Sequence, residues 1–175
     1  MRAVVLSVIT IALSSGLIAQ TPQVTARRPD INIPNPPILL RPIFQPIVRD
    51  AGKIFSGTVL EVEHQNSGSS SALATTNIRF RVDEAIRGVR KSEIVEVKEW
   101  AGLWESGERY HPGERVLLFL YPPSKLGLTS PVGHRAGRFP VNSTGGVLLP
   151  TNPGAKPKPI EIHKVVAAIR EAEQE

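Results

Sequence analysis

The amino-acid sequence predicts a mainly β protein: a small five-stranded barrel with a proline-rich arm before it and one amphipathic helix after it. Three observations support this fold class. Several runs of eight to ten residues are rich in β-branched side chains, an early segment is dense in proline, and the last residues are apolar at helical spacing. We divide the chain into a signal peptide (1–19), the arm (20–46), the β domain (47–149), a proline-rich linker (150–159) and the C-terminal helix (160–175).

Residues 1–19 have the features of a secretory signal peptide. Arg2 precedes an uncharged apolar stretch, and the small residue Ala19 is a suitable cleavage position. The alternative is an uncleaved membrane anchor, although the stretch is at the short end of the roughly 17–25 residues that a spanning helix needs. In either case, we expect the rest of the chain to work outside the cytoplasm, as a secreted, periplasmic or membrane-anchored protein.

The arm contains Pro22, Pro29, Pro34, Pro36, Pro37, Pro42 and Pro46. Each proline fixes φ and lacks an N–H donor, so the sequence predicts an extended segment without helix or central strand. Apolar residues such as Ile38 and Phe44 stand between the prolines, and they favour an arm that is partly docked on the domain over a free one.

The first predicted strand covers residues 54–63, and the residues from Gln65 to Thr75 are too polar and too small in side chain to form core. Gly57 lies inside the strand, which indicates a bulge or a sharp bend of the kind that a small barrel needs. We predict a second strand over residues 76–85, where Ile78 and its alternate neighbours face inward.

The third predicted strand covers residues 93–100, with Val95 and Val97 opposite Glu96 and Lys98. Residues 114–121 lack alternation, which predicts the most buried strand, covered on both faces. Shorter strands are expected at 126–131, 137–141 and 147–149. Residues 160–173 have apolar side chains at helical spacing, and Pro159 suits the first turn of that helix.

Charge and cysteine content exclude several function classes. The formal net charge is +5, from 21 basic and 16 acidic side chains, but the opposite signs are interleaved along the chain. Tracking a phosphate backbone needs a stripe of one sign, so we expect no nucleic-acid binding; the one local basic cluster is Arg87, Arg90 and Lys91. The absence of cysteine excludes thiol catalysis, cysteine–zinc sites and disulfides.

No motif for catalysis, metal binding or a cofactor is present, so we expect none of the three. The four histidines (64, 111, 134 and 163) show no short-range ligand pair, and no serine stands in a nucleophile motif. Carboxylates could serve hydrolysis of a cell-envelope polymer. Glu61, Glu63 and Glu105 are the candidates for that alternative, although Glu61 and Glu63 are expected on the opposite strand face from His64.

The loop from Trp100 to Gly113 is the best candidate for a binding site. It contains both tryptophans and one of the two tyrosines of a chain that is poor in aromatic residues. Exposed Trp and Tyr side chains anchor partners and sugars, so the candidate ligand-binding residues are Trp100, Trp104, Arg109 and Tyr110. The alternative is that Trp100 belongs to the core and Trp104 covers it.

Four blocks of the sequence resemble exported bacterial proteins with a netrin-module or metalloproteinase-inhibitor-like OB fold. The resemblance extends over residues 50–141, and its blocks are IFSGTVLEVE (54–63), IRFRVDEAIRG (78–88), EIVEVKEW (93–100) and ERYHPGERVLLFLY (108–121). It implies an OB-like barrel that serves as a binding scaffold. The inhibitory activity of the family depends on an N-terminal cysteine, and this chain has none, so no inhibitory residue carries over.

These observations leave three hypotheses for function. The first is an exported, non-enzymatic module that binds a protein or glycan of the cell envelope through the 100–113 loop. The second is the envelope hydrolase. The third is a structural envelope protein whose arm docks on a partner.

Overall fold

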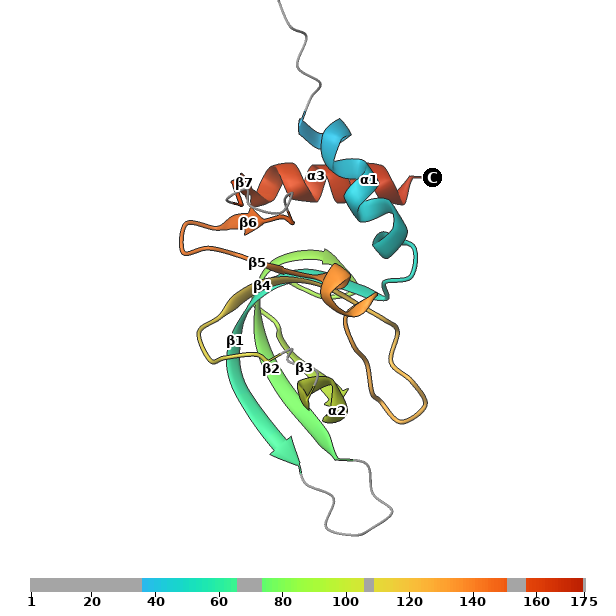
Figure 1. Ribbon diagram of the computed structural model, residues 1–175, viewed down its shortest axis with the longest axis vertical. Coiled ribbons are helices and arrows are strands. Elements are labelled where there is room, and N and C mark those ends of the chain that lie inside the picture. Colours follow the sequence, from blue (N-terminus) through green and yellow to red (C-terminus); the bar gives the residue numbers. More distant parts are fainter. Residues whose placement is uncertain (1–35, 66–73, 106–108, 151–156, 175) are drawn as a thin grey trace, which may run out of the picture. The chain divides into compact units, whose positions relative to one another are not determined.

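The computed structural model describes residues 36–65, 74–105, 109–150 and 157–174 (Figure 1). The predicted signal peptide, most of the arm and most of the linker lie outside these residues. The elements, in chain order, are α1 (Pro36–Val48), β1 (Lys53–Gln65), β2 (Thr75–Arg87), β3 (Ile94–Trp100), α2 (Gly102–Glu105), β4 (Arg115–Leu120), the 3-10 helix η1 (His134–Gly137), β5 (Arg138–Pro140), β6 (Gly146–Leu148), β7 (Pro159–Glu161) and α3 (Ile162–Glu173).

The predicted mainly β fold with a C-terminal helix is confirmed. Five antiparallel strands form one sheet in the order β3-β2-β1-β4-β5, and β6 and β7 form a separate pair. Among the described strands, none joins β3 to β5, so the sheet is open there instead of closing into the expected barrel. The backbone N–H of Thr129, in the connection between β4 and β5, donates to the carbonyl of Lys98 in β3 at 2.9 Å.

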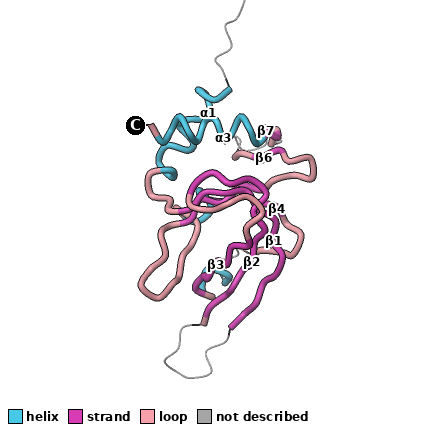
Figure 2. The backbone as a smooth tube through the Cα atoms, turned by 180° about the vertical axis from the view of Figure 1, so that it is seen from behind, coloured by secondary structure: helices cyan, strands magenta, loops and turns pink. Residues whose placement is uncertain are grey.

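The openness of the sheet follows from the chain after β4. The predicted strand at 126–131 is wrong: these residues form turns and a single bridge between Leu120 and Pro131. Pro122, Pro123 and Pro131 cannot donate to a ladder. The connection therefore folds back on itself (Figure 2), and the following β5 is only three residues long.

β4 is covered on both faces, as its lack of alternation predicts. Val116, Leu118 and Leu120 point into one apolar cluster, whereas Leu117 and Phe119 point into the other. We call the first the strand-side core; it also contains Phe55, Val59, Ile78, Phe80, Val82, Val95, Val97 and Tyr110. The second, the helix-side core, is completed by side chains of α1, α3 and β5. β4 lies between β1 and β5, so it is an inner strand.

Gly57 marks the irregularity in β1 that the sequence indicates. The register against β2 shifts between Ser56 and Gly57. A Cβ at this position would lie 2.9 Å from the carbonyl oxygen of Arg81 and 3.1 Å from the ring of Phe55. The missing side chain therefore lets β2 approach β1 closely where the strand bends.

The expectation that the proline-rich arm contains no helix is wrong for residues 36–46, which belong to α1. Pro36 and Pro37 occupy the first turn, where a missing N–H costs no hydrogen bond. Pro42 and Pro46 lie further inside the helix, where each removes one backbone hydrogen bond, and both are exposed. Burial at helical spacing offsets these losses: the buried residues are Leu40, Phe44, Ile47 and Val48.

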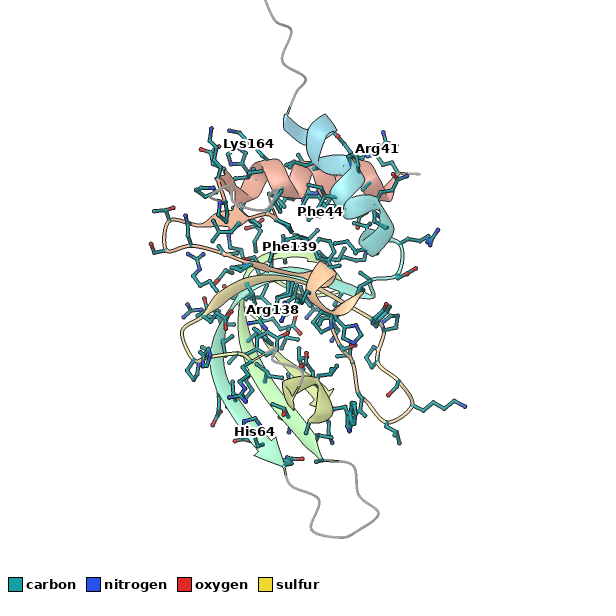
Figure 3. The ribbon with its side chains drawn as sticks, in the orientation of Figure 1. Arg41, Phe44, His64, Arg138, Phe139 and Lys164 are labelled. Atoms are coloured by element: carbon teal, nitrogen blue, oxygen red, sulfur yellow. The ribbon has the colours of Figure 1, made fainter. Side chains whose placement is uncertain are left out.

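α1 and α3 pack against each other and against one face of the sheet. Phe44 of α1 points toward Phe139 of β5 (Figure 3), with ring centroids 5.6 Å apart in an edge-to-face arrangement, and it stacks on Phe119 of β4 at 5.7 Å. α3 buries the predicted apolar residues Val165 and Ile169. The three residues before α3 form β7, so the predicted helix start at residue 160, with Pro159 in its first turn, is wrong.

Candidate functional site

The structure places the predicted binding residues whose side chains it describes in different environments. Trp100 is the last residue of β3, and its side chain is 52% exposed, so the alternative in which it belongs to the core is wrong. Trp104 lies in α2, and its side chain is outside the described part of the structure. Arg109 is exposed, whereas Tyr110 is buried.

Tyr110 supports the strand-side core. Its ring packs edge to face against the ring of Phe80, with the centroids 5.5 Å apart. The guanidinium of Arg138 lies over the ring of Tyr110, 4.1 Å from its centroid. Its hydroxyl donates to the buried carboxylate of Glu99 over 3.4 Å. Arg138 in turn donates to the carbonyl oxygen of Arg109 at 2.9 Å. Tyr110 and its neighbours therefore stabilise the interior, while Trp100 faces outward.

Trp100 instead shares a surface groove with a segment that the sequence did not indicate. The groove has a volume of about 350 Å³, and its described lining residues are Trp100, Leu103, Tyr121, Pro122, Ser124, Leu128, Thr129 and Ser130. We call it the Trp100 groove. One wall follows the end of β3 and α2, and the other follows the connection after β4. Because the two walls are distant in sequence, only the tertiary structure reveals the site.

The aromatic side chains of the Trp100 groove are held in position. Gly102 lies against the indole of Trp100, so closely that a Cβ there would be 2.3 Å from the ring. The hydroxyl of Tyr121 accepts a hydrogen bond from the backbone N–H of Gly133 at 3.3 Å. Side chains that are positioned before binding lose less conformational entropy when a ligand arrives. Trp100 and Tyr121 are therefore suitable anchors.

The 121–130 wall is ordered by its own hydrogen bonds. Thr129 donates its hydroxyl proton to the carbonyl oxygen of Tyr121 at 2.6 Å, and the hydroxyl of Ser124 accepts from the N–H of Leu128 at 3.2 Å. The N–H of Ser124 donates to the carbonyl of Leu128 at 2.8 Å. The wall thus presents hydroxyl groups in defined hydrogen-bonding roles. Within the described lining, no side chain carries a charge at neutral pH.

The carboxylates of the hydrolase hypothesis do not converge in the described structure. Glu61 pairs with Arg79 at 2.8 Å, and both side chains are nearly half exposed. Glu63 lines a second concavity of about 470 Å³ on the outer sheet face, together with Asn77, Arg79, Ile94 and Glu96. The side chain of Glu105 is not described.

The histidines and the other candidate ligands are dispersed. The ring Nδ1 of His64 lies 3.1 Å from the hydroxyl of Thr76, on the opposite strand face from Glu63, as predicted. Among the described residues, no group of three or more His, Asp or Glu side chains has an arrangement that could hold a metal ion. The pKa of Glu161, which precedes α3, is lowered by the hydrogen bond and the charge of Lys164; neither residue lines the groove.

Arg87, at the end of β2, is the one member of the basic cluster that the structure holds by several contacts among the described residues. Arg87 is bonded to Glu173 and to two backbone carbonyls, and Lys91 lies 3.7 Å from Glu84. Residues 142–144, which match the acceptor tripeptide for N-glycosylation, have the side-chain oxygen of Asn142 engaged: it accepts hydrogen bonds from Thr144 and from the N–H of Gly146. Arg87 and Asn142 therefore have structural roles in the fold.

Comparison with protein-family models, with curated proteins and with solved structures yields no match. Within the described residues, no helix combines the length and the apolar character that crossing a bilayer requires. The candidate site is therefore defined by its own geometry: two fixed aromatic side chains beside ordered hydroxyl groups in a groove at one end of the sheet.

Proposed function

We propose that this protein is an extracytoplasmic binding module that takes its ligand in the Trp100 groove. The observation that carries the proposal is the exposed indole of Trp100, held over Gly102 in a groove that also contains Tyr121. Exposed aromatic residues in preformed concave sites are frequent binding hot spots. The leader-like N-terminus supports a location outside the cytoplasm.

A binding role agrees better with the described side chains than hydrolysis does. General acid and base catalysis needs two carboxyl groups that face one reacting bond at a defined separation. Glu61 is engaged by Arg79, and the buried Glu99 receives a hydrogen bond from Tyr110 inside the core. The Trp100 groove contains no carboxylate among its described lining residues.

The experiment uses tryptophan fluorescence of the full chain. Trp104→Phe leaves Trp100 as the sole reporter, since the chain has two tryptophans. We expect a saturable change in Trp100 emission with at least one member of a panel of envelope-type oligosaccharides and extended peptides. Trp100→Ala should remove the binding detected by calorimetry, whereas Ile94→Ala, which truncates an exposed residue of the same strand, should retain it.

The same titrations separate the competing hypotheses. Mass spectrometry of the oligosaccharides after incubation should recover them intact; cleavage would favour the hydrolase. If no member of the panel binds, or if Trp100→Ala binds as well as the parent, the proposed function is wrong. Self-association that is lost on removal of residues 21–35 would favour the structural hypothesis instead.

A further inference from the structure

We infer that the ligand of the Trp100 groove is an uncharged oligosaccharide segment. This inference rests on the proposed function and names the chemical class that the groove recognises. Three properties of the described lining carry it: its aromatic surfaces, its hydroxyl groups and its lack of charged side chains.

The aromatic surfaces match the shape of a sugar ring. A pyranose has an apolar face of C–H bonds and a rim of hydroxyl groups, so it packs face-on against an aromatic ring while its rim reaches polar neighbours. Trp100 and Tyr121 are 52% and 38% exposed, and both line the groove. Aromatic side chains bring a large apolar area with little conformational freedom to lose. Two such rings can therefore hold a short run of sugar units.

The hydroxyl groups of the 121–130 wall favour a ligand that can both donate and accept hydrogen bonds. Thr129 has one hydroxyl proton, and it is used in the bond to the carbonyl of Tyr121, so toward a ligand this oxygen acts as an acceptor. Ser124 has the opposite role, because its oxygen accepts from Leu128 and its proton remains to donate. A sugar hydroxyl satisfies either neighbour.

The combination of an acceptor on Thr129 and a donor on Ser124 distinguishes a glycan from a proline-rich peptide, the other class of ligand that aromatic grooves commonly bind. Proline has no backbone N–H, so a proline-rich segment offers acceptors but few donors. It would leave the acceptor on Thr129 without a partner. The lone pairs of this oxygen would then lose their contact with water and gain no hydrogen bond from the ligand, which disfavours this class of ligand.

The absence of charge in the described lining disfavours the remaining classes. Anionic polymers and nucleic acids are held by several Lys or Arg side chains, and an anionic membrane surface typically needs a cluster of them. Lys125, in the turn of the 121–130 segment, is not among the described lining residues. The volume of about 350 Å³ lies at the lower end of the range for small-molecule sites, which suits a short glycan segment.

The experiment titrates the full chain carrying Trp104→Phe with defined probes. The neutral probes are cellohexaose, maltohexaose and N-acetylchitohexaose; the others are a hexagalacturonate, decaproline, and vesicles of phosphatidylcholine with phosphatidylglycerol. We expect at least one neutral hexasaccharide to bind, by fluorescence and by calorimetry. Its affinity should be the same in low and high salt, because no charged pair forms.

Variants test whether the groove is the site. Trp100→Ala and Tyr121→Ala should each weaken binding by at least about tenfold, which corresponds to about 1.4 kcal/mol. Gly102→Ala keeps both rings but displaces the indole, so binding should fall while the fold persists in far-UV circular dichroism. Tyr121→Phe keeps the ring and should bind within about threefold of the parent. Ile94→Ala and Leu126→Ala truncate exposed side chains outside the groove and should leave binding unchanged.

The outcomes separate the inference from the function on which it rests. Binding of decaproline, hexagalacturonate or vesicles without any neutral sugar overturns the glycan inference and leaves a groove-binding module. Sugar binding that survives both Trp100→Ala and Tyr121→Ala also overturns it, because the sugar then sits elsewhere. If none of the probes binds, both the inference and the proposed function are wrong.

Discussion

Arg87 joins three elements that would otherwise be held mainly by apolar contacts, and its removal is a direct test of the fold. Its guanidinium donates to the carbonyl oxygens of Val48 and Ala51 at 2.7 and 2.8 Å. It also donates to the carboxylate of Glu173 at 2.7 Å. The side chain of β2 thus satisfies carbonyl groups at and after the C-terminal end of α1, where a cation is favoured, and it fixes the end of α3.

The expected cost of Arg87→Ala follows from these contacts. Hydrogen bonds from a charged donor contribute about 1.5–3 kcal/mol each, and we take the lower value because the side chain is 32% exposed. The two carbonyl bonds then contribute about 3 kcal/mol. The ion pair with Glu173, itself 27% exposed, adds at most about 1 kcal/mol. We expect the free energy of unfolding to fall by about 3–4 kcal/mol.

Urea unfolding followed by far-UV circular dichroism measures this loss. Arg79→Ala is the matched control: Arg79 lies on the same strand, but its one described ion pair is the exposed contact with Glu61, so its loss should cost less than about 1 kcal/mol. Arg87→Lys should recover little, because a single ammonium group cannot reach the same acceptors in their fixed geometry. A loss below about 1 kcal/mol for Arg87→Ala, or equal losses for Arg87→Ala and Arg79→Ala, would refute the reasoning.

Three further predictions concern the packing of α1, the bend of β1 and the start of α3. Phe44→Ala should lower the free energy of unfolding by about 3–5 kcal/mol in urea, whereas the 37% exposed Ile43→Ala should cost less than about 1 kcal/mol. Gly57→Ala should cost about 1–3 kcal/mol in the same assay, since the new Cβ meets a backbone carbonyl of β2 at 2.9 Å. The pKa of Glu161, measured by NMR, should lie below 4.5 and rise toward that value in Lys164→Met. The pKa of this carboxyl is lower in the folded than in the unfolded protein, so any stability from its contact with Lys164 is present above pH 4.5. That stability is lost as the pH falls through the folded pKa.

Hydrophobic periodicity in the sequence was sufficient to predict those strands and helices that are stabilised by burial of one or both of their faces. The alternation in 76–85 predicts which side chains of β2 face inward, and the unbroken apolar run before Pro122 predicts a strand covered on both faces. The amphipathic spacing in 160–173 predicts the buried face of α3. In each case, the pattern and the contacts agree because the face of the strand or helix on which a residue lies decides whether its side chain is buried.

Proline density was misleading in the arm, because backbone preference and side-chain burial oppose each other there. Leu40 and Phe44 are four residues apart, and with Ile47 and Val48 they form a helical stripe. The sequence shows this spacing, but it does not show the apolar surface of α3 and β4. Packing against that surface stabilises α1 despite its two internal prolines. Only the packed structure shows that the surface is present.

The candidate site was likewise predicted only in part from the sequence. The concentration of aromatic residues in 100–113 identified Trp100 from the sequence, and the structure places its side chain at the surface. Tyr110 is equally aromatic but points into the core. The second aromatic residue of the groove is Tyr121, which directly follows β4 and lies outside the 100–113 segment.

The sequence by itself determined the fold class, most of the strands, the C-terminal helix and one aromatic residue of the candidate site. The tertiary structure decided the helix at 36–48, the open sheet and the second wall of the Trp100 groove. The physical reason is that a periodic pattern shows which residues of a strand or helix face the interior and which face solvent. A groove, in contrast, depends on the distance between segments that the chain brings together only when it folds.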